Sequence, residues 1–151
     1  MMILLLRHAD RLPDPADKLN PAGIARARLL TRMLQDSGVA HAYCSEFART
    51  AQTLAPLKQK LGAALAINPV PVNGPGGESH HINGIVNALK ALPSAAVAVV
   101  VSHNTTVGPI ISGLGGGPID PIKHNEFDKL FVLSLTAGAT SLLKLRYGDP
   151  T

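Results

Sequence analysis

Two uninterrupted apolar runs, residues 2–6 and 96–101, constrain the fold of this chain more than any other feature of its sequence. Each run is continuous in aliphatic residues instead of alternating with polar ones, which is typical of strands buried on both faces of a parallel sheet. Polar residues follow each run at once, Arg7-His8 after the first and Ser102-His103 after the second. We therefore expect a parallel sheet whose strands carry charged residues at their carboxyl ends.

The segments between and after these runs alternate between helical and extended patterns. Asn20-Pro21 supplies a helix start, apolar residues follow it at helical spacing from Ile24 to Leu34, and Gly38 ends a predicted helix of about five turns. Further helices are predicted at 49–61, 82–92 and 105–114, and further strands at 41–44, 65–70, 130–135 and 141–147. This order predicts an α/β fold, a three-layer α/β/α sandwich on a mostly parallel sheet, with a site at the carboxyl ends of the strands.

Length and composition limit the classes of protein to consider. With 151 residues, 46% of them hydrophobic, the chain is predicted to form a single domain over 1–151. The formal charge of +4 is spread along the chain, and there are only two Tyr, three Phe and no Trp. This pattern argues against a nucleic-acid partner, which requires clustered basic and aromatic residues, and is compatible with small anionic substrates. The single cysteine, Cys44, excludes an internal disulfide and is interpreted as a buried, inert thiol.

The sequence also bears on localisation. Arg7 interrupts the apolar start too early for a signal peptide, and no apolar stretch is long enough to span a membrane. We expect a cytoplasmic protein with no membrane partner.

Four charged residues follow predicted strands or begin a predicted helix: Arg7, His8, Arg49 and His103. Because the carboxyl ends of parallel strands converge, these residues can meet in one crevice although they lie far apart in sequence. Arginine presents a planar fork that matches phosphate oxygens. A neutral imidazole nitrogen is a nucleophile for phosphorus, and neighbouring arginines disfavour its cation. The crevice is therefore predicted to bind phosphate and to react with it.

The segments LLLRHAD, LNPAGIARARLL, CSEFARTAQTLAPL and VVVSHNTTVGPII together resemble the histidine phosphatase superfamily, also called phosphoglycerate-mutase-like. The resemblance extends over nearly the whole chain and implies a phosphoglycerate-mutase-like fold. It implies that His8 becomes phosphorylated, and that Arg7, Arg49 and His103 hold the phosphoryl group. Asn104 is expected to contact substrate, although the family's late motif places its asparagine one position further along.

The general acid is the open question in this resemblance. Mutases and broad phosphatases of the family carry a glutamate in an insert before the late strand, whereas this chain has only Glu78 and His80-His81 there, in a Pro/Gly-rich segment read as a flexible loop. In size it resembles the short phosphohistidine-phosphatase-like members, which lack the insert. Glu78 is retained as a candidate acid. His80 and His81 are adjacent and lack further ligands nearby, so no metal site and no cofactor is predicted.

The expected function is a metal-independent phosphatase that hydrolyses a phosphomonoester or a phosphoramidate through a phosphohistidine on His8. A small phosphorylated metabolite and a phosphohistidine protein both fit as substrate. Two alternatives stay open: a phospho-ligand binding protein of the same fold with weak catalysis, and a mutase-type phosphotransferase.

Overall fold

The computed structural model describes residues 1–151 and contains one six-stranded sheet with four α-helices and a short 3₁₀ turn, Gly62–Ala64. The elements follow one another along the chain as β1 Met2–Arg7, α1 Pro21–Leu34, β2 His41–Cys44, α2 Ala48–Leu61, β3 Ala66–Pro69, α3 Gly77–Lys90, β4 Val97–Ser102, α4 Val107–Gly113, β5 Lys129–Thr136 and β6 Ala139–Arg146.

The strands lie in the order β3-β2-β4-β1-β5-β6. The first four run parallel to one another, while β5 pairs antiparallel with β1 and β6 antiparallel with β5. The predicted fold class is confirmed: the two apolar runs, β1 and β4, are adjacent central strands, with Leu4 paired to Val99 and Arg7 to Ser102. This register places the ends of both strands, and the residues that follow them, side by side.

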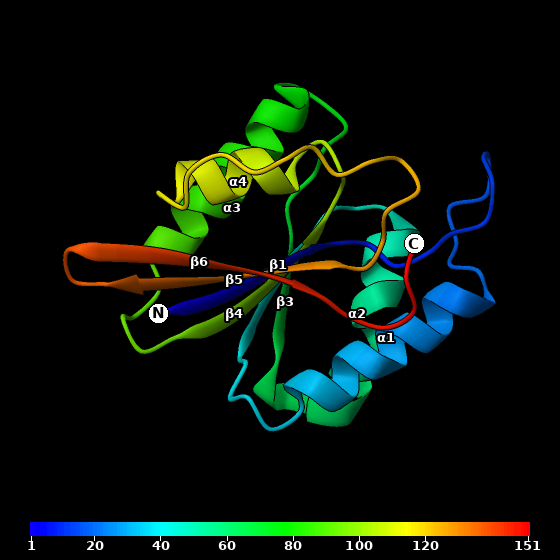
Figure 1. The fold of residues 1–151 in the computed structure, drawn as a ribbon, viewed down its shortest axis with the longest axis horizontal. Helices are drawn as coiled ribbons and strands as arrows, with labels where there is room; N and C mark the ends of the chain where they lie inside the picture. The colour runs from blue at the N-terminus through cyan, green and yellow to red at the C-terminus, as the bar shows by residue number, and fades with distance from the viewer.

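Alternate residues of the central strands face two separate cores. Ile3 and Leu5 pack with α3 and α4 on one face, whereas Leu4 and Leu6 pack with α1 and α2 on the other. Figure 1 shows the two helix pairs on opposite sides of the sheet. Because both faces of β1 and β4 are covered, a continuous apolar run is the expected sequence for these strands. None of the helices is both long and apolar enough to cross a membrane.

Two details differ from the helices that the sequence predicts. The first helix ends at Leu34, short of Gly38, and Ile24 is 44% exposed, so it does not belong to the buried face. Gly23 takes the inward position instead: a Cβ atom there would lie 1.9 Å from the carbonyl oxygen of Asp10. This close approach brings the start of α1 against the segment that follows His8.

The second difference concerns α3, which begins at Gly77 and not at residue 82. Glu78, His80 and His81 therefore lie in the first turns of a helix, and their assignment to a flexible loop is wrong. The Pro/Gly-rich composition of residues 71–77 hid the start of this helix, because its N-cap is Gly76 in the left-handed conformation and not a Ser, Thr, Asp or Asn. The interpretation of Cys44 agrees with the structure, since the side chain is buried and burial raises the pKa of its thiol to about 11.

Candidate active site

Two histidines meet where β1 and β4 end. The backbone N–H of His8 donates to the carbonyl oxygen of Ser102 at 2.9 Å, which extends the pairing of the two strands by one residue. The His8 and His103 rings then lie edge to face, with centroids 5.6 Å apart. The two residues are 2% and 7% exposed, respectively. Two histidines that lie far apart in the sequence therefore share one site that is largely shielded from solvent.

The orientation of His8 leaves one ring nitrogen available. Its Nδ1 lies 2.9 Å from the carbonyl oxygen of Ala9. A carbonyl can only accept, so Nδ1 carries the proton of the neutral ring and Nε2 keeps its lone pair. Burial lowers the pKa of His8 to about 3, and the charges of Arg7 and Arg49 act in the same direction. At neutral pH His8 is thus an uncharged imidazole with a free nucleophilic nitrogen.

His103 is held by a hydroxyl group. Its Nε2 lies 2.9 Å from Oγ of Ser45, which in turn contacts Oγ1 of Thr50 at 3.1 Å. Since a hydroxyl can both donate and accept, this contact accommodates the neutral and the protonated ring. Burial lowers the pKa of His103 to about 4, assisted by the charge of Arg49.

The guanidinium of Arg7 is fixed by backbone carbonyls from the segment before β5. Its Nη1 donates to the carbonyl oxygens of Lys123, His124 and Glu126 at 3.1, 2.6 and 3.0 Å. The Phe127 ring covers it at 4.1 Å. Its Nε is buried without a hydrogen-bond partner. Burial, followed by repulsion from neighbouring arginines, lowers the pKa of Arg7 to about 10, so the group remains a cation at neutral pH.

Arg49 sits in the first turn of α2 against an acidic partner. Its Nη1 donates to Oδ1 of Asp17 at 2.8 Å, and the Phe47 ring lies 4.1 Å from the guanidinium carbon. The same carboxylate accepts from the backbone N–H groups of Ala48 and Arg49, and so caps a helix whose own N-cap residue provides no side-chain bond. The buried Nε of Arg49 has no partner. Two arginine Nε donors beside the histidine pair therefore stay unsatisfied.

The remaining polar residues of the CSEFARTAQT segment position the site. Oγ1 of Thr53 accepts from the backbone N–H of Ala9 at 3.0 Å and donates to the carbonyl of Arg49 at 2.8 Å. This bridge ties the residue after His8 to α2. Asp10, two residues after His8, pairs with the Nε of Arg26 at 2.7 Å.

Glu78 and Asn104 lie at the edge of this arrangement. Oε1 of Glu78 accepts from the hydroxyl of Thr105 at 2.5 Å, so the carboxylate contacts the turn that follows His103, yet the residue is exposed. Asn104 follows His103 directly and is half-buried. The structure thus brings the buried Arg7, His8 and His103 together with the half-buried Arg49, and leaves Glu78 at the surface.

Sequence reasoning missed several groups that shape the site. Ser45, Phe47, Phe127 and the buried His81 all lie within contact of the residues described above. Ser45 and Phe47 lie inside the CSEFART segment, so their nearness to Arg49 was a usable signal. Phe127 carried none, because only the tertiary fold brings the segment before β5 to the end of β1. His81 was considered beside His80, but its contact with His103 depends on the tertiary placement of α3.

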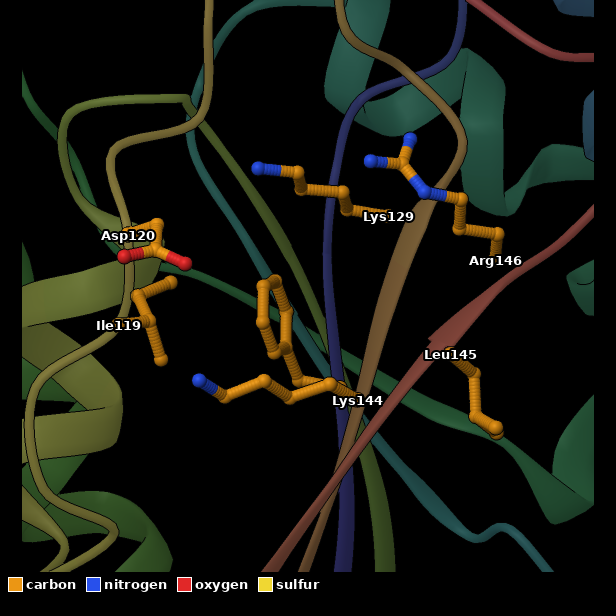
Figure 2. Close-up of a pocket in the computed structure, with 7 residues that line it drawn as sticks. Ile119, Asp120, Lys129, Lys144, Leu145 and Arg146 are labelled. Carbon is orange, nitrogen blue, oxygen red and sulfur yellow. The ribbon is translucent and has the colours of Figure 1, made fainter.

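The concavity in Figure 2 is a different place on the molecule. About 240 Å³ in volume, it lies beside the β5–β6 hairpin, where Lys129 and Lys144 extend toward Asp120 and Arg146 lines the far side. No residue of the histidine cluster lines it.

Comparison with known proteins finds one matching family. Residues 3–71 match the family model of the histidine phosphatase superfamily (branch 1). No curated protein sequence matches the chain.

Solved structures match over nearly the whole chain. The protein histidine phosphatase SixA complexed with tungstate aligns with a TM-score of 0.73 at 20% identity, covering 97% of each chain. The putative phosphohistidine phosphatase SixA from Nakamurella multipartitia aligns with 0.63 at 23% identity, covering 99% of this chain and 95% of the other. The alpha-ribazole phosphatase from Shigella flexneri aligns with 0.67 at 15% identity, covering 97% and 96%. The family-model match over residues 3–71 confirms the resemblance to the histidine phosphatase superfamily there, and the solved structures confirm the phosphoglycerate-mutase-like fold.

Proposed function

We propose that the chain is a single-domain phosphatase that hydrolyses its substrate through a phosphohistidine on His8, without a metal ion. One observation carries the proposal: a buried, neutral histidine with a free Nε2 lies beside two arginines that each keep an unpaired, buried Nε donor. A buried donor without a partner is costly, and a phosphoryl oxygen would satisfy it.

In the first step, Nε2 of His8 attacks phosphorus in line with the leaving group. The new P–N bond forms as the bond from phosphorus to the leaving oxygen or nitrogen breaks, and the leaving atom keeps the electron pair and takes up a proton. The Nδ1 bond to the Ala9 carbonyl stabilises the positive charge that develops on the ring. Arg7 and Arg49 compensate the charge on the phosphoryl oxygens, which is the main contribution a protein makes to phosphoryl transfer.

In the second step, a water oxygen bonds to phosphorus as the P–N bond breaks and its electron pair returns to Nε2 of His8. Inorganic phosphate leaves with the protons of the water, and His8 is again neutral with its proton on Nδ1. His103 is the proposed partner of the phosphoryl group in both steps. Its bond to the Ser45 hydroxyl persists whether or not the ring is protonated, so it can donate to a phosphoryl oxygen and later release that proton.

The substrate class follows from the state of the acids: the buried Asp10, Glu126 and Asp128 are each paired with a basic side chain. An ester leaves as an alkoxide that needs a proton, whereas a phosphoramidate nitrogen can be protonated from solvent before it departs. Glu78 is exposed and engaged by Thr105, so its role as acid is proposed only as a minor one. We therefore propose a preference for phosphoramidates, with a phosphohistidine protein ahead of a small phosphorylated metabolite. The similarity to the protein histidine phosphatase SixA supports this order.

The test is to trap the intermediate. Wild-type protein quenched early with ³²P-labelled phosphoramidate should carry an acid-labile, base-stable phosphoryl group, and His8→Ala should carry none and should not turn over. His80→Ala, which removes an exposed histidine, is the matched control and should behave as wild type. An equal acid-labile adduct in His8→Ala would overturn the nucleophile assignment. Stoichiometric phosphate binding by wild type without turnover would instead favour the phospho-ligand binding alternative.

A further inference from the structure

A third histidine lies behind the site and has no part in the mechanism above. His81 is 0% exposed and projects from the second turn of α3. Its ring centroid lies 6.2 Å from that of His103. A fully buried histidine must have both ring nitrogens satisfied, so its partners define what it does.

The partners of His81 fix its tautomer. Nδ1 lies 2.6 Å from the carbonyl oxygen of Val70, and Nε2 lies 2.7 Å from Oγ of Ser102. Since the carbonyl can only accept, Nδ1 carries the proton of the neutral ring and Nε2 accepts from the Ser102 hydroxyl. Burial lowers the pKa of His81, which keeps the ring neutral at physiological pH.

From Ser102 the hydrogen bonds continue to the turn that carries His103. Oγ of Ser102 lies 2.6 Å from Oγ1 of Thr106, and this oxygen accepts from the backbone N–H of His103 at 3.1 Å. Because the Ser102 hydroxyl donates to His81, it must accept from the Thr106 hydroxyl. The direction of each hydroxyl hydrogen bond in this network is therefore fixed. All members, His81, Ser102, His103 and Thr106, are buried.

We propose that His81 is a positioning residue for His103: through the Ser102 and Thr106 hydroxyls it fixes the turn that aims the His103 ring at the phosphoryl group. The inference rests on the proposed function, in which His103 contacts that group. A hydroxyl donates one proton at a time, so without His81 the Ser102 proton turns to Thr106, and the Thr106 hydroxyl turns to the carbonyl of His103, 3.3 Å away. The two hydroxyls can then form either of two hydrogen-bond arrangements, so the turn no longer holds the His103 ring in a single orientation.

The charged neighbourhood of His81 is mixed. Glu46 after β2 and Glu78 on α3 favour protonation of His81, whereas His80 on α3 disfavours it. A positive charge on His81 would in turn lower the pKa of His103 after β4. A charge on His81 would therefore act directly on His103, and the hydroxyl chain can reverse to accept it.

The test compares three substitutions of His81. His81→Gln keeps an acceptor for Ser102, His81→Asn keeps a donor for the Val70 carbonyl but withdraws from Ser102, and His81→Leu removes both bonds. Misplacing a group that acts on the transition state lowers kcat more than it raises KM, so we expect His81→Asn and His81→Leu to lose about tenfold or more in kcat with KM within about twofold. His81→Gln should recover kcat to within about threefold of wild type. His80→Leu, on the exposed side of the same turn, should be unchanged.

A second readout is independent of activity. The ¹⁵N resonances of the His103 ring should coincide in wild type and His81→Gln and should shift or broaden in His81→Asn, whose retained bond to Val70 favours folding. If His81→Asn keeps wild-type kcat and unchanged His103 resonances, the inference is wrong. If wild type shows no turnover while the His103 resonances respond as expected, the proposed function fails and the positioning role stands.

Discussion

Removing His8 should change how the stability of the protein depends on pH, because this ring is buried in its neutral form. The pKa of His8 is lowered from 6.5 to about 3, chiefly by burial. As pH falls below about 6.5, the unfolded chain binds a proton at this position and the folded protein does not. Folding stability is therefore lost progressively between about pH 6.5 and pH 3, while above pH 6.5 His8 contributes no pH dependence.

The size of the effect follows from the two pKa values. One pKa unit corresponds to about 1.36 kcal/mol, so lowering the pH from about 7.5 to about 4.5 removes roughly 2.7 kcal/mol of unfolding free energy through His8 alone. His103 adds a second loss of the same sign, because its pKa is lowered to about 4. His8→Gln, which has no titrating ring, should lack the first loss and retain the second.

The assay is urea unfolding followed by far-UV circular dichroism at about pH 7.5 and 4.5, applied to wild type, His8→Gln and the exposed-site control His80→Gln. Only the change in unfolding free energy between the two pH values is compared, so a difference in absolute stability between His8→Gln and wild type does not affect the test. Wild type and His80→Gln should lose roughly 2.7 kcal/mol more than His8→Gln over this interval. Equal losses in all three proteins would refute the assignment of His8 as a buried neutral base.

Two further predictions concern the chemistry. Glu78→Gln should slow ester hydrolysis by less than about tenfold and leave phosphoramidate hydrolysis unchanged, because an exposed carboxylate that accepts from Thr105 is a weak proton donor. Positioned acids contribute about 10²–10⁴-fold to the rate, so a loss beyond about a hundredfold on esters would identify Glu78 as a true general acid. EDTA should leave turnover unchanged, because Arg7 and Arg49 supply the positive charge that a metal ion would otherwise provide. Vanadate, a mimic of pentacoordinate phosphorus, should inhibit competitively. Activity that is lost to EDTA and restored by zinc or magnesium would contradict this prediction.

Those parts of the fold that depend on local pattern could be predicted from the sequence. The run from Ile3 to Leu6 is apolar on both faces because each face meets its own helix pair, and such a strand belongs in the middle of the sheet. The same logic predicted that His8 and His103 meet in one crevice at the ends of parallel strands, and the structure shows that these two strands are neighbours. Neither inference needed knowledge of any distant contact.

What sequence reasoning could not supply depends on tertiary contacts and on burial. The start of α3 was missed because its N-cap is a glycine with positive φ, not a residue whose side chain caps the helix. The low pKa of His8 was attributed to neighbouring arginines, whereas burial is its largest cause and the arginine charges are secondary. Arg49 and Asp17 are 32 positions apart in the sequence, so no local pattern predicts that they form a pair.

The two arginines of the site are held in different ways, and this difference bears on what each can do for a phosphoryl group. Arg7 is fixed by three neutral carbonyls, which orient the guanidinium without cancelling its charge. Arg49 is fixed by the carboxylate of Asp17, which compensates part of its charge while also capping α2. Near the surface such a pair contributes little to stability, so the carboxylate serves mainly to aim the guanidinium. Arg7 is therefore the main source of uncompensated positive charge beside His8, and its three carbonyl partners belong to residues 123–126, a segment with no recognisable motif. The orientation of the Arg7 charge therefore depends on the backbone geometry of this segment and not on its side chains.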